Sequence, residues 1–359
     1  MGNRTLVPFG PQHPVLPEPI HLDLVVEDDK VMEAIPSIGF IHRGLEKLVE
    51  KREYLDMVYV AERICGICSF IHGLNYCKGV EEIMNIQVPV RAQYLRTIWS
   101  ELSRVHSHVL WLGLLADAFG FENLFMDTMR IREQVLDIAE DTAGGRVIFG
   151  GNKVGGARRD ISKERLAQMD REVSGMLAEL KRMGDVFMKD YSVLSRLKEV
   201  GVLSKQDAYD LGCVGPMARG SGIAQDLRQT KYAAYGDLDF QPITHPDGDC
   251  FSRTYVRVHE IYQSIDLIRQ AIAKIPDGPV DVKVVGAPNG EVFTRVEQPR
   301  GEVVYHIKGN GTRYLERFRV RTPTFANVPA LVKMLQGCDL ADVPVVVLII
   351  DPCISCTER

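Results

Sequence analysis

The segment R-I-C-G-I-C-S-F-I-H (63–72) places Cys65 and Cys68 three residues apart. A second pair, Cys353 and Cys356, lies in the final stretch D-P-C-I-S-C-T-E-R. In a C-x-x-C pair, a tight turn or a helix start brings the sulfurs of residues i and i+3 together. Two such pairs can supply four thiolates to one metal, which here would join the first fifth of the chain to its last residues.

Three interpretations of these pairs compete. A structural zinc knuckle usually has its two pairs within about 15–20 residues of each other, so the wide separation argues against a local knuckle. A thioredoxin-type redox pair needs one C-x-x-C in a βαβ context, which the surrounding pattern lacks. A catalytic metal centre that joins the two ends of a large core fits best. A structural zinc site that joins the two pairs, and unlinked or redox-active pairs, remain as alternatives.

The remaining four cysteines are expected to be small buried residues of the core. They are Cys77, Cys213, Cys250 and Cys338. Disulfides are not expected, because the N-terminus M-G-N-R-T-L-V-P lacks the apolar region of a secretory signal.

Composition narrows the function classes. The chain has 359 residues, of which 45% are hydrophobic and 25% charged, as in soluble globular proteins. A formal net charge of −5 makes it a poor nucleic-acid binder. No window approaches the 18 or more apolar residues of a membrane-spanning helix. The length allows two domains or one large one.

Hydrophobic periodicity predicts a mainly helical chain. Apolar residues recur at helical spacing in five segments, which are 43–62, 91–118, 122–145, 161–192 and 253–275. The glycine-rich loop G-G-N-K-V-G-G-A (150–157) lacks the lysine and hydroxyl ending of a phosphate-binding loop, and is interpreted as a structural turn.

Strand patterns lie near the two ends of the chain. Alternating residues before and after the acidic turn Glu27–Asp29 predict a β-hairpin within about residues 1–35. Short β-like runs fill 279–321, and the apolar run Val343–Ile350 is predicted to be a buried strand that Asp351-Pro352 ends.

The predicted fold class is mainly α with small α+β parts, in a single domain over 1–359. We expect four successive parts in it. They are the hairpin at about 1–35, a helical core at about 43–275, a mixed β region at about 279–350 and a metal-binding tail at 351–359.

Read together, the cysteine pairs and their flanks strongly resemble the large, catalytic subunit of nickel–iron hydrogenases. The family motif R-x-C-G-x-C-x-x-x-H is matched from Arg63 to His72, and D-P-C-x-x-C from Asp351 to Cys356. P-R-G (299–301) and T-P-T-F-A-N (322–327) are similar to further family segments near the metals. The resemblance implies a central bundle of long helices with short β-sheets near the N-terminal and C-terminal thirds.

Other motifs are similar to the quinone-site subunit of respiratory complex I. These are G-P-Q-H-P (10–14), H-R-G-L-E-K (42–47) and G-P-M-A-R-G-S-G-I-x-x-D-x-R (215–228). Complex I relatives lack the four metal cysteines, whereas this chain has them. The resemblance therefore implies an energy-converting hydrogenase of group 4, of the Ech type. Many members lose a C-terminal extension after nickel insertion, so the end at Arg359 is either processed or never had one.

The resemblance also implies roles for individual residues. Nickel would be bound by four thiolates, of which Cys65 and Cys353 are terminal while Cys68 and Cys356 bridge to an iron that carries carbon monoxide and cyanide. Four further residues are implied around the metals: Arg300 over the open metal position, Thr324 as a donor to the iron ligands, Asp351 as the partner that orients Arg300, and His72 as a donor to a bridging sulfur.

Two glutamates complete the implied site. Glu18, in L-P-E-P, is similar in position to the family's proton-transfer glutamate, although it could simply be a loop residue between prolines. Glu46 corresponds to a glutamate that helps to bind a second metal, magnesium or iron, near a C-terminal histidine. Here the last residue is Arg359, so a buried Glu46–Arg359 ion pair is the alternative.

Several partners follow from the same resemblance. The sequence has no motif for an iron–sulfur cluster of its own, so a small subunit with a 4Fe–4S cluster is expected to dock near the metals. A ferredoxin-like electron-transfer subunit, integral-membrane ion-translocating subunits and ferredoxin as electron donor are also implied. The chain would be a peripheral subunit on the cytoplasmic side of the cell membrane, reducing protons to H₂ reversibly.

Alternative functions remain at this stage. One is a complex I-like docking subunit without hydrogenase activity, whose cysteines bind zinc or nothing. Others are a carbon-monoxide-linked hydrogenase and an H₂-uptake or sensory hydrogenase.

Overall fold

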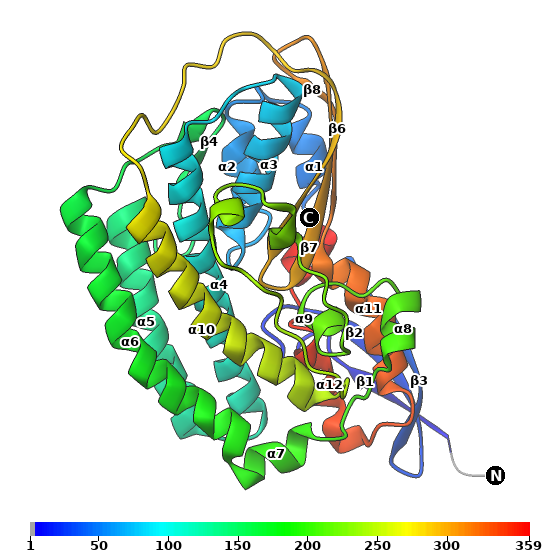
Figure 1. The fold of residues 1–359 in the computed structure, drawn as a ribbon. Coiled ribbons are helices and arrows are strands. Elements are labelled where there is room, and N and C mark those ends of the chain that lie inside the picture. Colours follow the sequence, from blue (N-terminus) through cyan, green and yellow to red (C-terminus); the bar gives the residue numbers. More distant parts are fainter. Residues whose placement is uncertain (1–3) are drawn as a thin grey trace.

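The computed structural model describes residues 4–359. Four long helices form a bundle on one side of the fold (Figure 1). They are α4 (Val90–Ala118), α5 (Glu122–Ala143), α6 (Lys163–Lys189) and α10 (Cys250–Lys274). The helices predicted over 91–118, 122–145 and 253–275 are confirmed with slightly shifted ends. The segment predicted as one helix over 161–192 contains α6 and the start of a second helix, α7 (Tyr191–Leu197).

Helix α4 occupies the centre of this bundle and packs against α5, α10 and α3 (Ser69–Ile83). It is buried along almost its whole length, including several charged residues that point away from solvent. Helix α6 is amphipathic instead, with one apolar stripe that includes Leu166, Met169 and Val173. A buried helix such as α4 can place polar side chains in the interior only where hydrogen-bond or ion-pair partners are available to them.

The N-terminal part forms a three-stranded antiparallel sheet in the order β1 (Thr5–Phe9), β2 (His21–Glu27) and β3 (Lys30–Ser37). The predicted hairpin is therefore β2–β3, and β1 adds a third strand. Asp28 and Asp29 both have positive φ, as the two-residue turns of tight hairpins require.

A second sheet contains β6 (Asn289–Gln298), β7 (Gly301–Asn310) and β8 (Leu315–Arg321). The β6–β7 hairpin turns through Pro299 and Arg300, with Gln298 opposite Gly301 in register. A small third sheet pairs β4 (Asn152–Lys153) with β5 (Gly156–Ala157) in the glycine-rich loop, which is a structural turn as predicted.

Short helices connect these parts. The remaining α-helices are α1 (Leu45–Val49), α2 (Met57–Glu62), α8 (Lys205–Asp210), α9 (Pro216–Arg219), α11 (Pro323–Leu335), α12 (Val343–Ile349) and α13 (Ile354–Glu358). Three 3-10 helices are η1 (Leu227–Thr230), η2 (Tyr235–Asp237) and η3 (Leu340–Asp342). The segment predicted as one helix over 43–62 is thus two helices, α1 and α2, separated by a turn.

The predicted strand over Val343–Ile350 is wrong, because this run forms helix α12. Pro344 stands in its first turn, where its missing N–H costs no hydrogen bond. The helix is apolar all round because its residues are buried between α4, α10 and α11. The mixed β region predicted to reach residue 350 therefore ends with β8, and residues 279–285 contribute only an isolated bridge at Asp281.

The last helix, α13, is buried in the fold, where it packs against α11. No helix within residues 4–359 is both long enough and apolar enough to cross a lipid bilayer.

Candidate metal centre

Both cysteine pairs use the same local geometry. Cys68 is the N-cap residue of α3, and its backbone N–H points at the sulfur of Cys65 with N···S of 3.5 Å. Cys353 is the N-cap residue of α13, and the N–H of Cys356 points at the Cys353 sulfur with N···S of 3.4 Å. In each pair a helix start brings the two sulfurs to one side, as the spacing predicts.

The fold then brings the two pairs together. The sulfurs of Cys68 and Cys356 are 3.4 Å apart, and those of Cys65 and Cys353 are 3.2 Å apart. All four sulfurs lie within 4.8 Å of one another and are buried. These separations exceed the ~2.05 Å of a disulfide and approach the ~3.8 Å between ligands on a tetrahedral metal with metal–sulfur bonds of about 2.3 Å. The donor set therefore fits a soft metal bound by four thiolates.

The electrostatics of the four thiols also favour a cation. Burial raises the pKa of Cys356, and hydrogen bonds with the other three thiols raise it further. Four buried thiolates would repel one another without a positive charge among them. A bound metal would supply that charge and displace the thiol protons.

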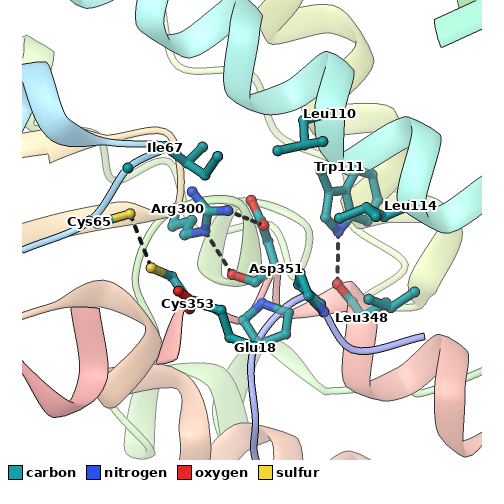
Figure 2. A pocket seen from close by; sticks show the side chains of 13 residues that line it. Glu18, Cys65, Ile67, Leu110, Trp111, Leu114, Arg300, Leu348, Asp351 and Cys353 are labelled. Carbon is teal, nitrogen blue, oxygen red and sulfur yellow. Dashed lines mark hydrogen bonds and ion pairs between the residues drawn. The ribbon is translucent and has the colours of Figure 1, made fainter. Parts of the chain in front are cut away.

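Arg300 reaches this centre from the β6–β7 turn. Its Nη2 lies 2.7 Å from Asp351 Oδ1, and its Nε donates to the Asp351 carbonyl at 2.9 Å. Its Nη1 donates to Ser107 Oγ on α4 at 3.2 Å. Although burial opposes the charged form, Asp351 and the cysteine sulfurs raise the pKa of Arg300 well above its ordinary value. Arg300 is thus a fixed positive charge facing Cys65 and Cys353 (Figure 2).

Glu18 lies beside the second cysteine pair. Its Oε2 accepts a hydrogen bond of 2.9 Å from the backbone N–H of Ser355, and its Oε1 accepts one from the Ser355 hydroxyl. It is half-buried and lines the same cavity as Cys353, so its carboxylate connects that cavity with the surface.

A cavity of about 230 Å³ joins these groups. Its polar wall is formed by Cys65, Cys353, Glu18, Arg300 and Asp351, and its apolar wall by α4 and α12 residues. The latter include Leu110, Trp111, Leu114 and Leu348 (Figure 2). Trp111 is fixed there by a hydrogen bond of 2.7 Å from its indole N–H to the Leu348 carbonyl. The cavity suits a small apolar reactant that meets a few polar groups at one end.

His72 and Thr324 contact the cysteines directly. His72 Nε2 lies 3.3 Å from the Cys356 sulfur, and its Nδ1 lies 2.6 Å from the Tyr305 hydroxyl. Thr324 Oγ1 accepts the backbone N–H of Cys353 at 3.2 Å, which leaves its hydroxyl hydrogen available. Sequence reasoning missed Tyr305, because its place in an alternating strand indicates only a core residue.

Glu46 is not part of the four-cysteine group, and its carboxylate is bound by two arginines and a backbone N–H of this chain. Its carboxylate is held by Arg359 Nε at 2.9 Å, by Arg319 and by the backbone N–H of Val320 at 2.9 Å. Burial opposes ionisation, yet the hydrogen bonds from these arginines lower the pKa of Glu46. Two guanidinium groups thus occupy the place where a cation would bind, which is the ion-pair alternative.

The other cysteines pack as expected. Cys77, Cys213 and Cys250 belong to the main apolar core, and Cys338 packs against it. Burial raises the pKa of Cys213 to about 11 and that of Cys250 to about 12, so neither is a thiolate at neutral pH.

Comparison with known proteins matches the chain to two families. The family "Respiratory-chain NADH dehydrogenase, 49 Kd subunit" matches residues 119–285 and 282–359, and "Nickel-dependent hydrogenase" matches residues 43–118. The second match includes the first cysteine pair.

Individual relatives match along nearly the whole chain. The carbon monoxide-induced hydrogenase of Rhodospirillum rubrum is 40% identical, over 98% of this chain and 99% of its own length. The membrane-bound hydrogenase subunit alpha of Pyrococcus furiosus is 37% identical, over 98% and 87%. A chain in the structure of the membrane-bound sulfane sulfur reductase, an archaeal respiratory membrane complex, superimposes with a TM-score of 0.94, 31% identity and 99% coverage of both chains.

Proposed function

The chain belongs to the family of energy-converting nickel–iron hydrogenase large subunits and the related 49 kDa subunit of complex I, and we propose that it catalyses the reversible reduction of protons to H₂. The observation that supports this proposal is the meeting of four buried cysteine sulfurs within 4.8 Å. A nickel–iron centre bound by them, with carbon monoxide and cyanide on the iron, would supply the redox chemistry that makes or splits H₂. Cys65, Cys68, Cys353 and Cys356 are its proposed ligands.

The residues around the sulfurs have matching tasks in this proposal. Arg300, oriented by Asp351, holds a positive charge beside the cavity. His72 Nε2 lies 3.3 Å from the Cys356 sulfur, to which it donates in the tautomer that carries the hydrogen there, and Thr324 has a hydroxyl hydrogen to offer to an iron ligand. Together they neutralise and orient an anionic metal centre in a site from which water is largely excluded.

Proton transfer is assigned to Glu18. A proton at the Cys353 sulfur must cross from a buried site to solvent, and a positioned carboxylate is an efficient carrier. Glu18 faces the cavity on one side, is half-exposed on the other and bonds to Ser355, two residues from Cys353. These contacts support it as the first carrier outside the metal centre.

Electrons are proposed to enter where the first cysteine pair reaches the surface. Gly66 is exposed and Ile67 half-buried between two buried cysteines. A small subunit with a 4Fe–4S cluster could therefore approach the metals closely at this turn. We propose reduced ferredoxin as donor, through a ferredoxin-like subunit, and ion translocation by integral-membrane subunits that would hold this chain at the cytoplasmic side of the cell membrane.

A second function is favoured by one comparison. The chain from the membrane-bound sulfane sulfur reductase has almost the same fold, and that complex is named for a substrate other than protons. In that case the subunit would reduce a different acceptor or serve a complex I-like docking role. A carbon-monoxide-linked hydrogenase, as in the Rhodospirillum rubrum relative, is a variant of the first proposal that differs in electron source.

The test is an assay of the purified whole complex. We expect H₂ evolution with reduced ferredoxin and H/D exchange between H₂ and D₂O without any added donor. A nickel-loaded and iron-loaded complex that shows neither activity but reduces polysulfide or a quinone would contradict the hydrogenase proposal.

A further inference from the structure

The C-terminal end of helix α12 is held by two large side chains from neighbouring helices. Trp111 of α4 donates from its indole N–H to the Leu348 carbonyl at 2.7 Å, and Arg257 of α10 donates from Nη2 to the Ile349 carbonyl at 2.9 Å. Both side chains are at most 1% exposed. The last carbonyl groups of a helix lack partners within it, so these two donors complete the end of α12.

Arg257 and Trp111 also contact each other. Arg257 Cζ lies over the Trp111 ring, 4.1 Å from its centroid. An indole attracts a guanidinium more strongly than the other aromatic side chains do. Trp111 lines the cavity beside the metal centre, whereas Arg257 is fully buried behind it. Arg257 therefore supports this wall without contacting a reactant.

Arg257 keeps its charge in this buried place. Burial lowers its pKa to about 10, although the negative charges of Asp351 and Glu260 oppose that effect. The positive charges of Arg300 and Arg253 act in the same direction as burial. A pKa near 10 leaves the guanidinium charged at neutral pH, so it acts there as a permanent donor of hydrogen bonds.

Asp351, which follows the end of α12, has an unusual backbone conformation. Its φ is +55°, in the left-handed region that favours glycine. The next residue is Pro352, and a residue before proline normally adopts an extended conformation. Such a conformation persists only where surrounding contacts impose it.

Contacts on both sides impose this turn. The Asp351 N–H donates at 2.8 Å to the Leu348 carbonyl, which also accepts from Trp111. On the other side, Arg300 donates to the Asp351 carbonyl and pairs with Oδ1. Asp351 Oδ2 has no hydrogen-bond partner within residues 4–359. The orientation of the carboxylate toward Arg300 therefore depends largely on the backbone turn.

Helix α4 connects the two sides of this turn. Ser107, which accepts from Arg300, and Trp111 are one helical turn apart on the same face of α4. Arg257 adds a fixed point from α10. A displacement of the end of α12 would move Asp351, and with it both Arg300 and Cys353.

We propose that Arg257 is a positioning residue of the metal centre, which fixes the turn at Asp351 and so places Arg300 and Cys353. The proposal rests on the proposed function, because it is tested on the ligands of a bound iron. A guanidinium suits this task better than an ammonium group. One planar group donates to the carbonyls of Ile349 and Arg253 while it covers the indole ring.

The test is the infrared spectrum of the metal ligands in the purified whole complex, with the metal content measured on the same sample. Arg257→Lys keeps the charge but removes the planar group that bonds to Ile349 and covers Trp111. We expect the carbon monoxide and cyanide bands to shift, because Arg300 moves relative to the iron. H/D exchange should fall by about 10²-fold while nickel and iron stay bound.

A second variant acts on the other donor to the same helix end. Trp111→Phe keeps an aromatic ring under Arg257 but removes the N–H that Leu348 accepts. It should shift the same bands. In the double variant the losses of H/D exchange should not multiply, because both side chains act through one turn.

Arg253→Lys is the matched control. Arg253 is also fully buried, one turn earlier on α10, but it donates to the loop carbonyls of Gly201 at 2.9 Å and Gly248 at 2.8 Å rather than to the end of α12. We expect this variant to lose stability and to keep the wild-type bands. A purely structural role of Arg257 predicts that the two lysine variants behave alike.

Wild-type bands in a metal-loaded Arg257→Lys complex would overturn the proposal, and so would an equal shift in Arg253→Lys. If Arg257→Lys does not assemble, Trp111→Phe decides, and unshifted bands in that variant overturn the proposal. Absence of the carbon monoxide and cyanide bands from the wild type would instead overturn the proposed function.

Discussion

Cys68 is the residue on which the two cysteine pairs depend most. It caps α3, holds Cys65 through its backbone N–H, and meets the sulfur of Cys356 at 3.4 Å. We expect Cys68→Ala to abolish nickel retention, because three thiolates with a gap cannot complete the site. Metal analysis of the purified complex measures this.

Cys77→Ala is the matched control on the same helix. Cys77 is fully buried in the main apolar core, apart from the cluster that the four cysteine sulfurs form. Its loss should cost on the order of 1 kcal/mol of stability and leave the metal content intact. Wild-type nickel in Cys68→Ala would contradict the four-thiolate assignment.

A substitution at Glu18 is expected to impair proton transfer without affecting metal binding. Glu18→Gln keeps an oxygen that accepts from Ser355 but cannot carry a proton at neutral pH. We expect H/D exchange to fall by about 10²-fold or more, with nickel and iron still bound. Glu27→Gln, at the end of β2 and paired with Arg4, should exchange like the wild type. Unaltered exchange in Glu18→Gln would remove Glu18 from the pathway.

The carboxyl group of Glu62 is expected to make the free energy of unfolding depend on pH. Its carboxylate is buried without a hydrogen-bond partner, and burial raises its pKa from 4.5 to about 7. The folded state therefore binds the proton more tightly than the unfolded state. This contribution to stability is complete below pH 4.5 and is lost as the pH rises through about 7.

We expect Glu62→Gln to remove that loss. The amide is neutral at every pH and offers a donor to the unpaired Oδ1 of Asn152 nearby. Its advantage over the wild type should grow between pH 5 and pH 8 toward a limit on the order of 3 kcal/mol. Denaturant unfolding at several pH values measures it, and parallel stability curves for the two proteins would show that Glu62 is charged throughout.

At the scale of elements, the β6–β7 turn that carries Arg300 is held by a close contact of two glycines. Gly215 has φ +67°, and a Cβ there would lie 2.3 Å from the Arg300 carbonyl oxygen. Gly215→Ala should therefore displace the turn, cost about 1–3 kcal/mol of stability and lower H₂ evolution by up to about 10²-fold.

Gly175→Ala in α6 is the control for this substitution. Its Cβ would meet no atom within 4 Å, and alanine favours the helix by about 1 kcal/mol. A Gly215→Ala enzyme with full activity would show that the position of the turn does not matter for catalysis.

Helix α12 shows what the sequence could not decide. Val, Ile and Leu in an unbroken run favour a buried strand as much as a buried helix, because periodicity is lost when every face is apolar. Contacts with α4, α10 and α11 favour the helix, and these contacts cannot be predicted from residues 343–350 alone. Long amphipathic helices such as α6 were predictable, because apolar residues at helical spacing indicate the face that packs on the core.

The site was predicted better than its surroundings. The C-x-x-C spacing favoured a four-thiolate site, and the family resemblance implied Arg300 and Asp351 beside it; the structure brings these residues together. The buried ion pairs of α4 were not predicted, because Glu101, Arg104 and His108 have the spacing of a solvated helix face, and partners such as Arg228 of η1 and Glu260 of α10 lie far along the chain. Long-range pairs of this kind leave no local pattern in one sequence.

At the scale of the whole molecule, the two ends of the chain close on one point. Residues 65–68 stand at the start of α3 and residues 353–356 at the start of α13, and the helical bundle and both larger sheets surround the place where they meet. A metal bound there contributes its binding free energy to the stability of the entire fold. This explains how a chain with an ordinary core can position a site from segments at its two extremes.

The most direct test of this account is the infrared spectrum of the purified complex, recorded together with its metal content. The account predicts bands of carbon monoxide and cyanide bound to iron, with one nickel and one iron for each copy of this chain. Zinc alone in the four-cysteine site, without those bands, would contradict it.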